Sequence, residues 1–206
     1  TCSGLEPVQY WMHANMLLLN SQKMAKSTGN YVLPKEIITG ENTVLSKAFA
    51  PSVVRFFNMQ AHYRSILDFS SDALEASEKG YYKLMEALHT LDGVERSTSS
   101  TFDVAQWKKQ CYAAMNDDFN TPILIAHLFE GVKLINQLKE QKASITEQDY
   151  TLFRETMHAF IFDVMGLTNE TKQDSSNKID GVVALLIKLR KEARDNKDWG
   201  LSLIHI

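Results

Sequence analysis

The chain has 206 residues, of which 44% are hydrophobic, and this is enough for one large domain or two small domains with hydrophobic cores. Its formal net charge of -3 gives no basic field over the whole molecule, so any nucleic-acid contact must depend on local patches. The two cysteines, Cys2 and Cys111, supply neither a disulfide framework nor a zinc-ligand spacing. No apolar run approaches the roughly 20 residues that span a bilayer and no signal peptide is recognisable, so we expect a cytoplasmic protein.

The first apolar stretch covers residues 10–19, contains aromatic residues and ends in the turn signal Asn20-Ser21, which predicts a buried strand. Trp11 and His13 would lie on the same side of this strand. We expect Trp11 to lie in the core and His13 to be a structural histidine rather than an acid or base. The chain begins at Thr1 without a methionine, and we interpret it as a fragment of a longer protein.

A lysine-containing stretch follows, Lys23-Met24-Ala25-Lys26-Ser27 and then Thr28-Gly29-Asn30. Lysine carries a compact charge on a flexible stem that can follow phosphate oxygens, and glycine permits the positive φ of a tight loop. Fixed cations stabilise the charge that develops on a leaving phosphate in phosphoryl or nucleotidyl transfer. The composition therefore favours a mobile loop that binds a polyphosphate, although a K-x-x-K pattern taken alone is more often a pair of solvated lysines.

Helical patterns dominate the next part of the chain. Pro34 suits the first turn of a short helix over 35–39 that Gly40 closes, and 41–50 is expected to be a second short helix or helical loop. A helix beginning at Pro51 would bury a stripe of apolar residues, which are Val53, Val54, Phe56, Phe57 and Ala61. Residues 70–72 can cap a long helix that runs to about Leu91. The Ser/Thr run 97–101 is the best candidate domain boundary, and we expect a solvated linker there.

Beyond residue 101 the sequence shows four helical patterns and almost no strand signal, which predicts an antiparallel bundle with short connections. Cys111 lies on the apolar stripe of the first pattern and is expected to be a buried, inert thiol. Thr121 is the expected N-cap of the second helix and Pro122 its first residue, so we assign Asp117-Asp118 to the start of that helix and not to a metal site. Residues 146–149 resemble a capping box. The residues expected to point inward are Val104, Trp107, Cys111 and Met115; then Ile125, Leu128, Phe129, Val132 and Ile135; then Tyr150, Phe153, Met157, Phe160, Ile161 and Val164.

The last helical pattern runs from Ile179 to about Trp199. Arg190, Arg194 and Lys197 share one of its faces, a spacing suited to phosphate or base contacts. Acidic residues interleaved at i, i+4 spacing favour a solvated, ion-paired face instead, and both interpretations stay open. Residues 201–206 break the polar pattern abruptly and are interpreted as a non-native tail.

Residues 23–27 resemble the K-M-S-K-S loop of class I aminoacyl-tRNA synthetases, with Ala25 in place of the central serine. Further stretches in the same order resemble the cysteinyl-tRNA synthetase family: Tyr10-Trp11-Met12-His13, Ala61-His62-Tyr63-Arg64-Ser65, Asp68-Phe69-Ser70 and Met115-Asn116-Asp117-Asp118-Phe119-Asn120-Thr121-Pro122. The similarity runs from about Tyr10 to Trp199. It implies a mainly α chain, in which the remnant of a class I α/β catalytic domain precedes a helical linker region and an antiparallel bundle of the anticodon-binding type.

The resemblance also implies a division of the chain. Residues 1–40 would end the catalytic domain and carry the lysine loop, and residues 41–96 would form the helical linker that contacts the RNA stem. Residues 97–200 would form the anticodon-binding bundle, with 201–206 as the tail. The resemblance also implies that 41–50 is a local insertion relative to related synthetases.

The activity implied is ATP-dependent ligation of L-cysteine to its tRNA through cysteinyl-adenylate, by a cytoplasmic monomer. Lys26 and Lys23 would be the catalytic cations on the phosphates of ATP, which would bind together with Mg²⁺. Met24, Ala25 and Ser27 would complete the ATP-binding loop. Arg194, Arg190 and Lys197 would contact tRNA. The family's zinc ligands and its H-I-G-H-type loop are absent from this sequence, so we expect no metal site here and no activity from the fragment alone. The alternatives are a class I synthetase of another specificity and a non-catalytic helical tRNA-binding module.

Overall fold

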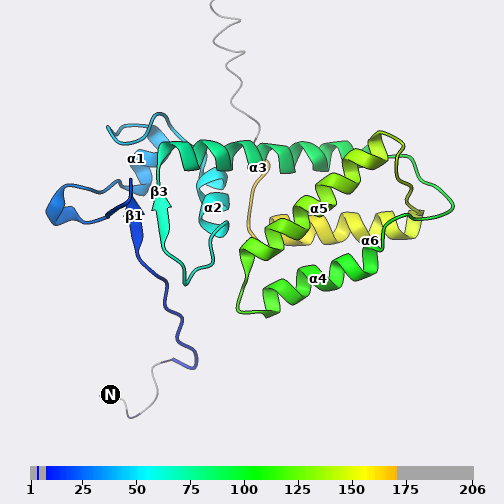
Figure 1. Ribbon diagram of the computed structural model, residues 1–206, viewed down its shortest axis with the longest axis horizontal. Helices are drawn as coiled ribbons and strands as arrows, with labels where there is room; N and C mark the ends of the chain where they lie inside the picture. The colour runs from blue at the N-terminus through cyan, green and yellow to red at the C-terminus, as the bar shows by residue number, and fades with distance from the viewer. Residues whose placement is uncertain (1–3, 5–7, 171–206) are drawn as a thin grey trace, which may run out of the picture. The chain divides into compact units, whose positions relative to one another are not determined.

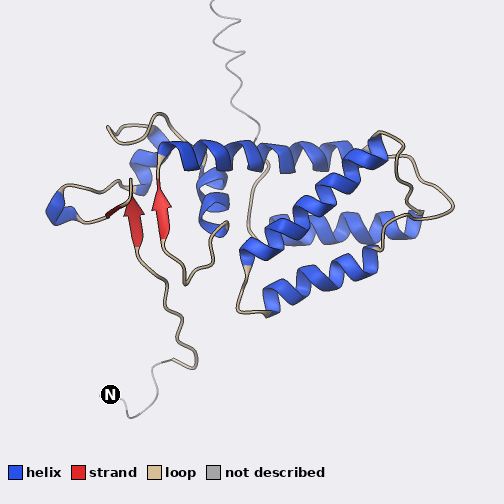
Figure 2. Cartoon of the chain, viewed as in Figure 1, coloured by secondary structure: helices blue, strands red, loops and turns tan. Residues whose placement is uncertain are grey.

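The computed structural model describes residue 4 and residues 8–170 (Figure 1). Its three-stranded sheet has the order β2-β1-β3 and is built from β1 (Leu17–Leu19), β2 (Gln22–Lys23) and β3 (Leu67–Phe69). β1 pairs with β2 antiparallel and with β3 parallel. The helices are α1 (Pro34–Thr39), α2 (Pro51–Met59), α3 (Ser71–Asp92), α4 (Val104–Asn116), α5 (Thr121–Lys139) and α6 (Glu147–His158), with a 3₁₀ turn η1 (Lys26–Thr28) and a π-helical segment η2 (Ala159–Val164). The described residues are thus mainly α-helical with one small mixed sheet, as predicted (Figure 2).

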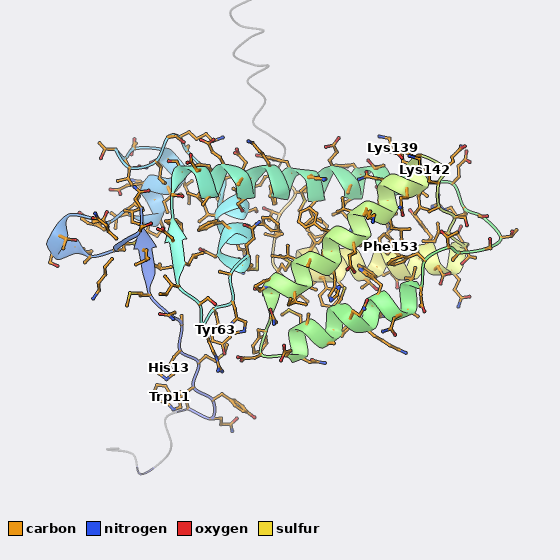
Figure 3. The ribbon with its side chains drawn as sticks, in the orientation of Figure 1. Trp11, His13, Tyr63, Lys139, Lys142 and Phe153 are labelled. Carbon is orange, nitrogen blue, oxygen red and sulfur yellow. The ribbon has the colours of Figure 1, made fainter. Side chains whose placement is uncertain are left out.

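The predicted strand over 10–19 is wrong for most of its length, because the regular strand comprises Leu17–Leu19 alone. Strands β2 and β3 pair with those residues, whereas the preceding stretch is tied down through Asn15, whose amide donates to the Tyr63 carbonyl at 3.0 Å. No strand forms at residues 11–13, but the rings of Trp11 and His13 stack with their centroids 6.0 Å apart (Figure 3). Trp11 is 70% exposed, so its expected place in the core is also wrong.

Helices α1 and α3 form as their sequences predict. Pro34 opens α1, and Gly40 ends it in the left-handed conformation with φ 76°. The Ser70 hydroxyl accepts a hydrogen bond from the Ala73 amide and thereby caps α3, which runs to Asp92. On α2 the buried face is narrower than expected, since Val53, Phe56 and Phe57 are buried while Val54 is partly exposed and Ala61 lies beyond the helix.

No helix forms over 41–50, where a short helix or helical loop was expected. The Asn42 side chain accepts hydrogen bonds from the amides of Val44 and Leu45, which gives the chain a local alternative to helical bonding. The Phe49 amide donates to the Ile37 carbonyl at 3.0 Å, and the Phe49 ring is buried. The segment is therefore an irregular loop that packs against α1.

Helix α4 packs against α5 and α6, α5 meets α6 at Gly131, and α3 packs against both α2 and α5. The predicted inward residues of these helices are buried, with three exceptions: Met115 and Phe129 are partly buried and Val164 is 50% exposed. Val164 is the last residue of the π-helical segment 159–164, whose wider turn rotates it away from the face that it would occupy in an α-helix.

The start of α5 differs from the prediction by one residue. Asn120 is the N-cap and Thr121 is the first helical residue. Instead of capping, the Thr121 hydroxyl donates to the Met59 carbonyl at 2.7 Å and joins the start of α5 to the end of α2.

The Ser/Thr run 97–101 is not a plain solvated linker. The Ser97 amide donates to the Ile145 carbonyl at 2.8 Å, and the Thr101 amide donates to the Ser144 carbonyl at 3.0 Å. Thr146 caps α6 as predicted, but its own amide donates to the Ser100 hydroxyl and not to a side chain of a capping box. The domain boundary proposed within this run stays a prediction.

Candidate functional site

The lysine loop begins with a tight hairpin between β1 and β2. Asn20 and Ser21 both have positive φ, 51° and 62°, as a two-residue hairpin turn of the I′ type requires. The Asp68 carboxylate accepts hydrogen bonds from the Ser21 amide at 2.9 Å and from the Ser21 hydroxyl at 2.8 Å. The Asn20 amide donates to the Phe69 carbonyl at 2.9 Å. Strand β3 therefore fixes the base of the loop.

The tip of the loop is closed by its own polar groups. Ala25 and Asn30 face each other in an isolated β-bridge, and the Thr28 hydroxyl donates to the Ala25 carbonyl at 2.9 Å. Gly29, at φ 72°, ends the 3₁₀ turn with a bond from its amide to the Lys26 carbonyl. The Asn30 amide group reaches the carbonyls of residues 19, 22 and 23. The loop is thus a compact turn built on the hairpin.

Both lysines of this loop are exposed. Among the described residues neither Lys23 nor Lys26 takes part in an ion pair, so both ammonium groups are available to an external anion. Met24 and Ala25 between them are partly buried, and Ser27 is exposed. Such an arrangement can bind a polyphosphate through two cations on a fixed turn.

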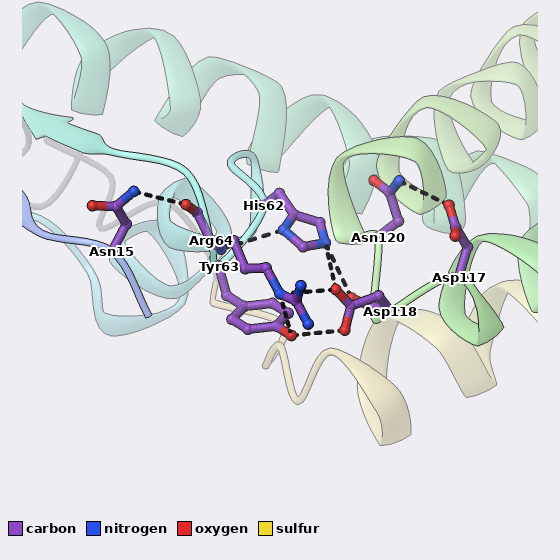
Figure 4. A network of polar contacts seen from close by, with 7 residues as sticks. All are labelled: Asn15, His62, Tyr63, Arg64, Asp117, Asp118 and Asn120. Carbon is purple, nitrogen blue, oxygen red and sulfur yellow. Dashed lines mark hydrogen bonds and ion pairs between the residues drawn. The ribbon is translucent and has the colours of Figure 1, made fainter. Parts of the chain in front are cut away.

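A second polar site joins segments that are distant in sequence (Figure 4). The Tyr63 hydroxyl donates to one oxygen of the Asp118 carboxylate at 2.7 Å, and Arg64 Nε lies 3.0 Å from the other. His62 Nε2 lies 3.1 Å from the Asp118 carbonyl oxygen. Our assignment of Asp118 to the start of a helix missed these contacts. The signal that points to them is the pairing of basic and acidic residues in the stretches 61–65 and 115–122.

The remaining predicted site residues, Arg190, Arg194 and Lys197, lie outside the described residues, and so does the 201–206 tail. Within residue 4 and residues 8–170, no group of three or more His, Cys, Asp or Glu side chains could hold a metal ion. In the same residues no helix is long and apolar enough to span a membrane. Cys111 is fully buried, and this burial raises the pKa of its thiol to about 12, as expected for an inert cysteine.

Two protein-family models match the chain. Residues 1–79 match the catalytic domain of tRNA synthetases class I (C), and residues 110–160 match the DALR domain. The first match covers the lysine loop, α1 and α2, and the second covers most of α4 to α6.

Several curated relatives are cysteine–tRNA ligases. The chain is 45% identical to that of Bacteroides thetaiotaomicron, 43% identical to that of Bacteroides fragilis and 42% identical to that of Parabacteroides distasonis. Each alignment covers 97% of this chain but 41% of the relative, so the chain spans about two fifths of their length. On these matches, the chain belongs to the cysteine–tRNA ligase family of class I tRNA synthetases.

Proposed function

We propose that this chain is part of an enzyme that ligates L-cysteine to its tRNA at the expense of ATP, through cysteinyl-adenylate. The observation that carries the proposal is the pair of exposed lysines, Lys23 and Lys26, on a closed turn within the region matched to a class I catalytic domain. The three relatives named above, at 42–45% identity, favour cysteine over another amino acid, because each is a cysteine–tRNA ligase by name.

In the first step the cysteine carboxylate attacks the α-phosphate of ATP and pyrophosphate leaves. Lys26 is the main cation on the departing phosphates and Lys23 the second, while the backbone of residues 24–27 lines the nucleotide. In the second step a terminal hydroxyl of the tRNA takes the cysteinyl group. Mg²⁺ would accompany ATP, and zinc belongs to the family. The described residues hold no cluster that fits a zinc ion.

The helices matched to the DALR domain support a tRNA-binding role for the bundle. We assign the anticodon contacts to Arg194, Arg190 and Lys197. The enzyme would act as a cytoplasmic monomer.

The test is pyrophosphate exchange by a complete enzyme in which this chain replaces the aligned segment of the Bacteroides thetaiotaomicron ligase. Lys26→Ala should lower kcat by about 100-fold and leave the KM for cysteine unchanged, as expected when a contact is strongest in the transition state. Lys35→Ala removes the same charge from the exposed surface of α1 and should leave kcat unchanged. Equal rates for the Lys26 variant and the unmodified enzyme would refute the proposed role.

A further inference from the structure

Two stretches on which the family resemblance rests, 61–65 and 115–122, meet in space at one carboxylate. We propose that Asp118 is a positioning residue that couples the helical bundle to the lysine loop: it holds the 62–64 segment, which in turn holds the sheet that carries the loop. The structural coupling stands independently of the proposed function, and only its effect on catalysis depends on that function.

The first link joins the α4–α5 turn to residues 62–64. The Asp118 carboxylate accepts the Tyr63 hydroxyl at 2.7 Å and pairs with Arg64 Nε at 3.0 Å. Arg64 Nε also donates to the Tyr63 hydroxyl oxygen at 3.0 Å, so the three groups form a closed triangle. The hydrogen bond to Tyr63 and the pairing with Asp118 raise the pKa of the Arg64 guanidinium.

An ion pair of this exposure is weak on its own, because the Arg64 and Asp118 side chains are 65% and 41% exposed and water screens them. The backbone conformation of the α4–α5 turn supplies a further contact to the 62–64 segment. Asp118 and Phe119 both have a φ of 53°, a conformation uncommon for residues other than glycine, and it turns the Asp118 carbonyl toward His62. The Arg64 amide donates to His62 Nδ1 at 3.3 Å, so Nε2 carries the proton that faces the Asp118 carbonyl oxygen.

A neighbouring contact strengthens the same junction. The Thr121 hydroxyl donates to the Met59 carbonyl at 2.7 Å, in a partly buried position. The α4–α5 turn therefore holds the chain at two places, at the end of α2 and at the 62–64 segment. Truncating one contact leaves the other in place, so single variants here should fold.

The second link joins residues 62–64 to the sheet. The Asn15 amide donates to the Tyr63 carbonyl at 3.0 Å, and the Asn15 side-chain amide donates to the Arg64 carbonyl at 2.8 Å (Figure 4). Strand β1 begins two residues after Asn15 and leads directly into the lysine hairpin. On the other side, 62–64 continues into β3, whose Asp68 holds the Ser21 turn. A contiguous set of contacts thus runs from the bundle to the lysine loop.

Hydrogen exchange of the 206-residue chain tests the coupling directly. In Asp118→Asn, which keeps the shape but removes the charge, the amides of Asn20, Ser21 and Ala25 should exchange about tenfold faster, as expected for the loss of a hydrogen bond to a charged group. Tyr63→Phe removes only the hydroxyl donor and should act in the same direction. The coupling is overturned if faster exchange is confined to residues 62–65 and 115–122.

Asp117→Asn is the matched control. The Asp117 carboxylate is adjacent in sequence and exposed, and its hydrogen-bond partner in the described structure is the Asn120 side chain at 3.4 Å. Its substitution removes the same charge without touching residues 62–64, so exchange at the hairpin should match the unmodified chain. Faster exchange at the hairpin in this control would assign the effect to net charge and overturn the proposal.

Pyrophosphate exchange by the complete chimeric enzyme gives the functional readout. Asp118→Asn should lower kcat about fivefold with the KM for cysteine unchanged, because the loop's cations would be less well placed in the transition state. If the hairpin amides exchange faster while kcat stays unchanged, the coupling holds and the catalytic role of the loop fails. The two failures are therefore distinguishable.

Discussion

At the scale of single residues, the bundle leaves little space where side chains of α6 pack against the backbone of α5. Gly131 lies inside α5 and is buried. A Cβ placed there would lie 3.1 Å from Met157 Sδ and 3.2 Å from Phe153 Cζ. The Phe153 ring packs against Trp107 with a centroid distance of 4.8 Å, which leaves it little room to move.

Gly131→Ala should therefore lower the free energy of unfolding. The gain in helix propensity is about 1 kcal/mol, whereas overpacking a dense core costs about 1–3 kcal/mol, so a net loss of about 1 kcal/mol is expected. Gly80→Ala in α3 is the matched control, because its nearest neighbour, Phe56 Cε1, lies at an ordinary 3.4 Å. Urea unfolding should show Gly80→Ala slightly stabilised; stabilisation of both variants would contradict the packing argument.

At the scale of elements, most helices were predicted correctly from the sequence, whereas strand pairing was not. Pro34, Gly40 and Ser70 act through local backbone chemistry, so a sequence window is enough to place the helix ends they define. The strand over 10–19 failed because pairing depends on distant backbone, which apolar periodicity does not encode.

The candidate site likewise has one part that was predictable from the sequence and one part that was not. The lysine loop was recognised from its own residues, and its turn and Gly29 conformation follow from local chemistry. The Asp118 junction was missed because its partners, Tyr63 and Arg64, are more than fifty residues away in the sequence. Long-range polar contacts of this kind leave no periodic signal.

The junction between the Ser/Thr run and α6 yields a prediction about an element. The Ser100 hydroxyl accepts from the Thr146 amide at 3.0 Å and donates to the Asp149 carboxylate. Ser100→Ala should lower the free energy of unfolding by about 1–2 kcal/mol, since it leaves a helix-start amide without its acceptor. Ser99→Ala, at an exposed neighbouring position, should change it by less than about 0.5 kcal/mol. Equal thermal midpoints for the two variants would mean that the run contributes nothing to holding α6.

At the scale of the whole molecule, one core connects the sheet region to the bundle through α3, which packs against both α2 and α5. Figure 1 shows α3 lying along both parts of the described chain. Loss of packing in the bundle should therefore destabilise all of residues 8–170. The effect of pH on a buried titratable group provides a way to measure this stability.

Cys111 is such a group, because it is fully buried on α4 and this burial raises its thiol pKa from 9.0 to about 12. The folded state favours the neutral thiol, so its contribution to stability is complete below pH 9 and is lost as the pH rises toward 12. At pH 10.5 the loss should be about 2 kcal/mol, from 1.36 kcal/mol for each pH unit above the unfolded pKa. Other groups also titrate in this range, so the measurement is a difference between the unmodified chain and Cys111→Ala in urea unfolding at pH 8 and pH 10.5. The unmodified chain should lose about 2 kcal/mol more than the variant. Parallel losses in the two proteins would show that the thiol ionises as readily in the folded state as in the unfolded one, which the dry interior of the bundle should prevent.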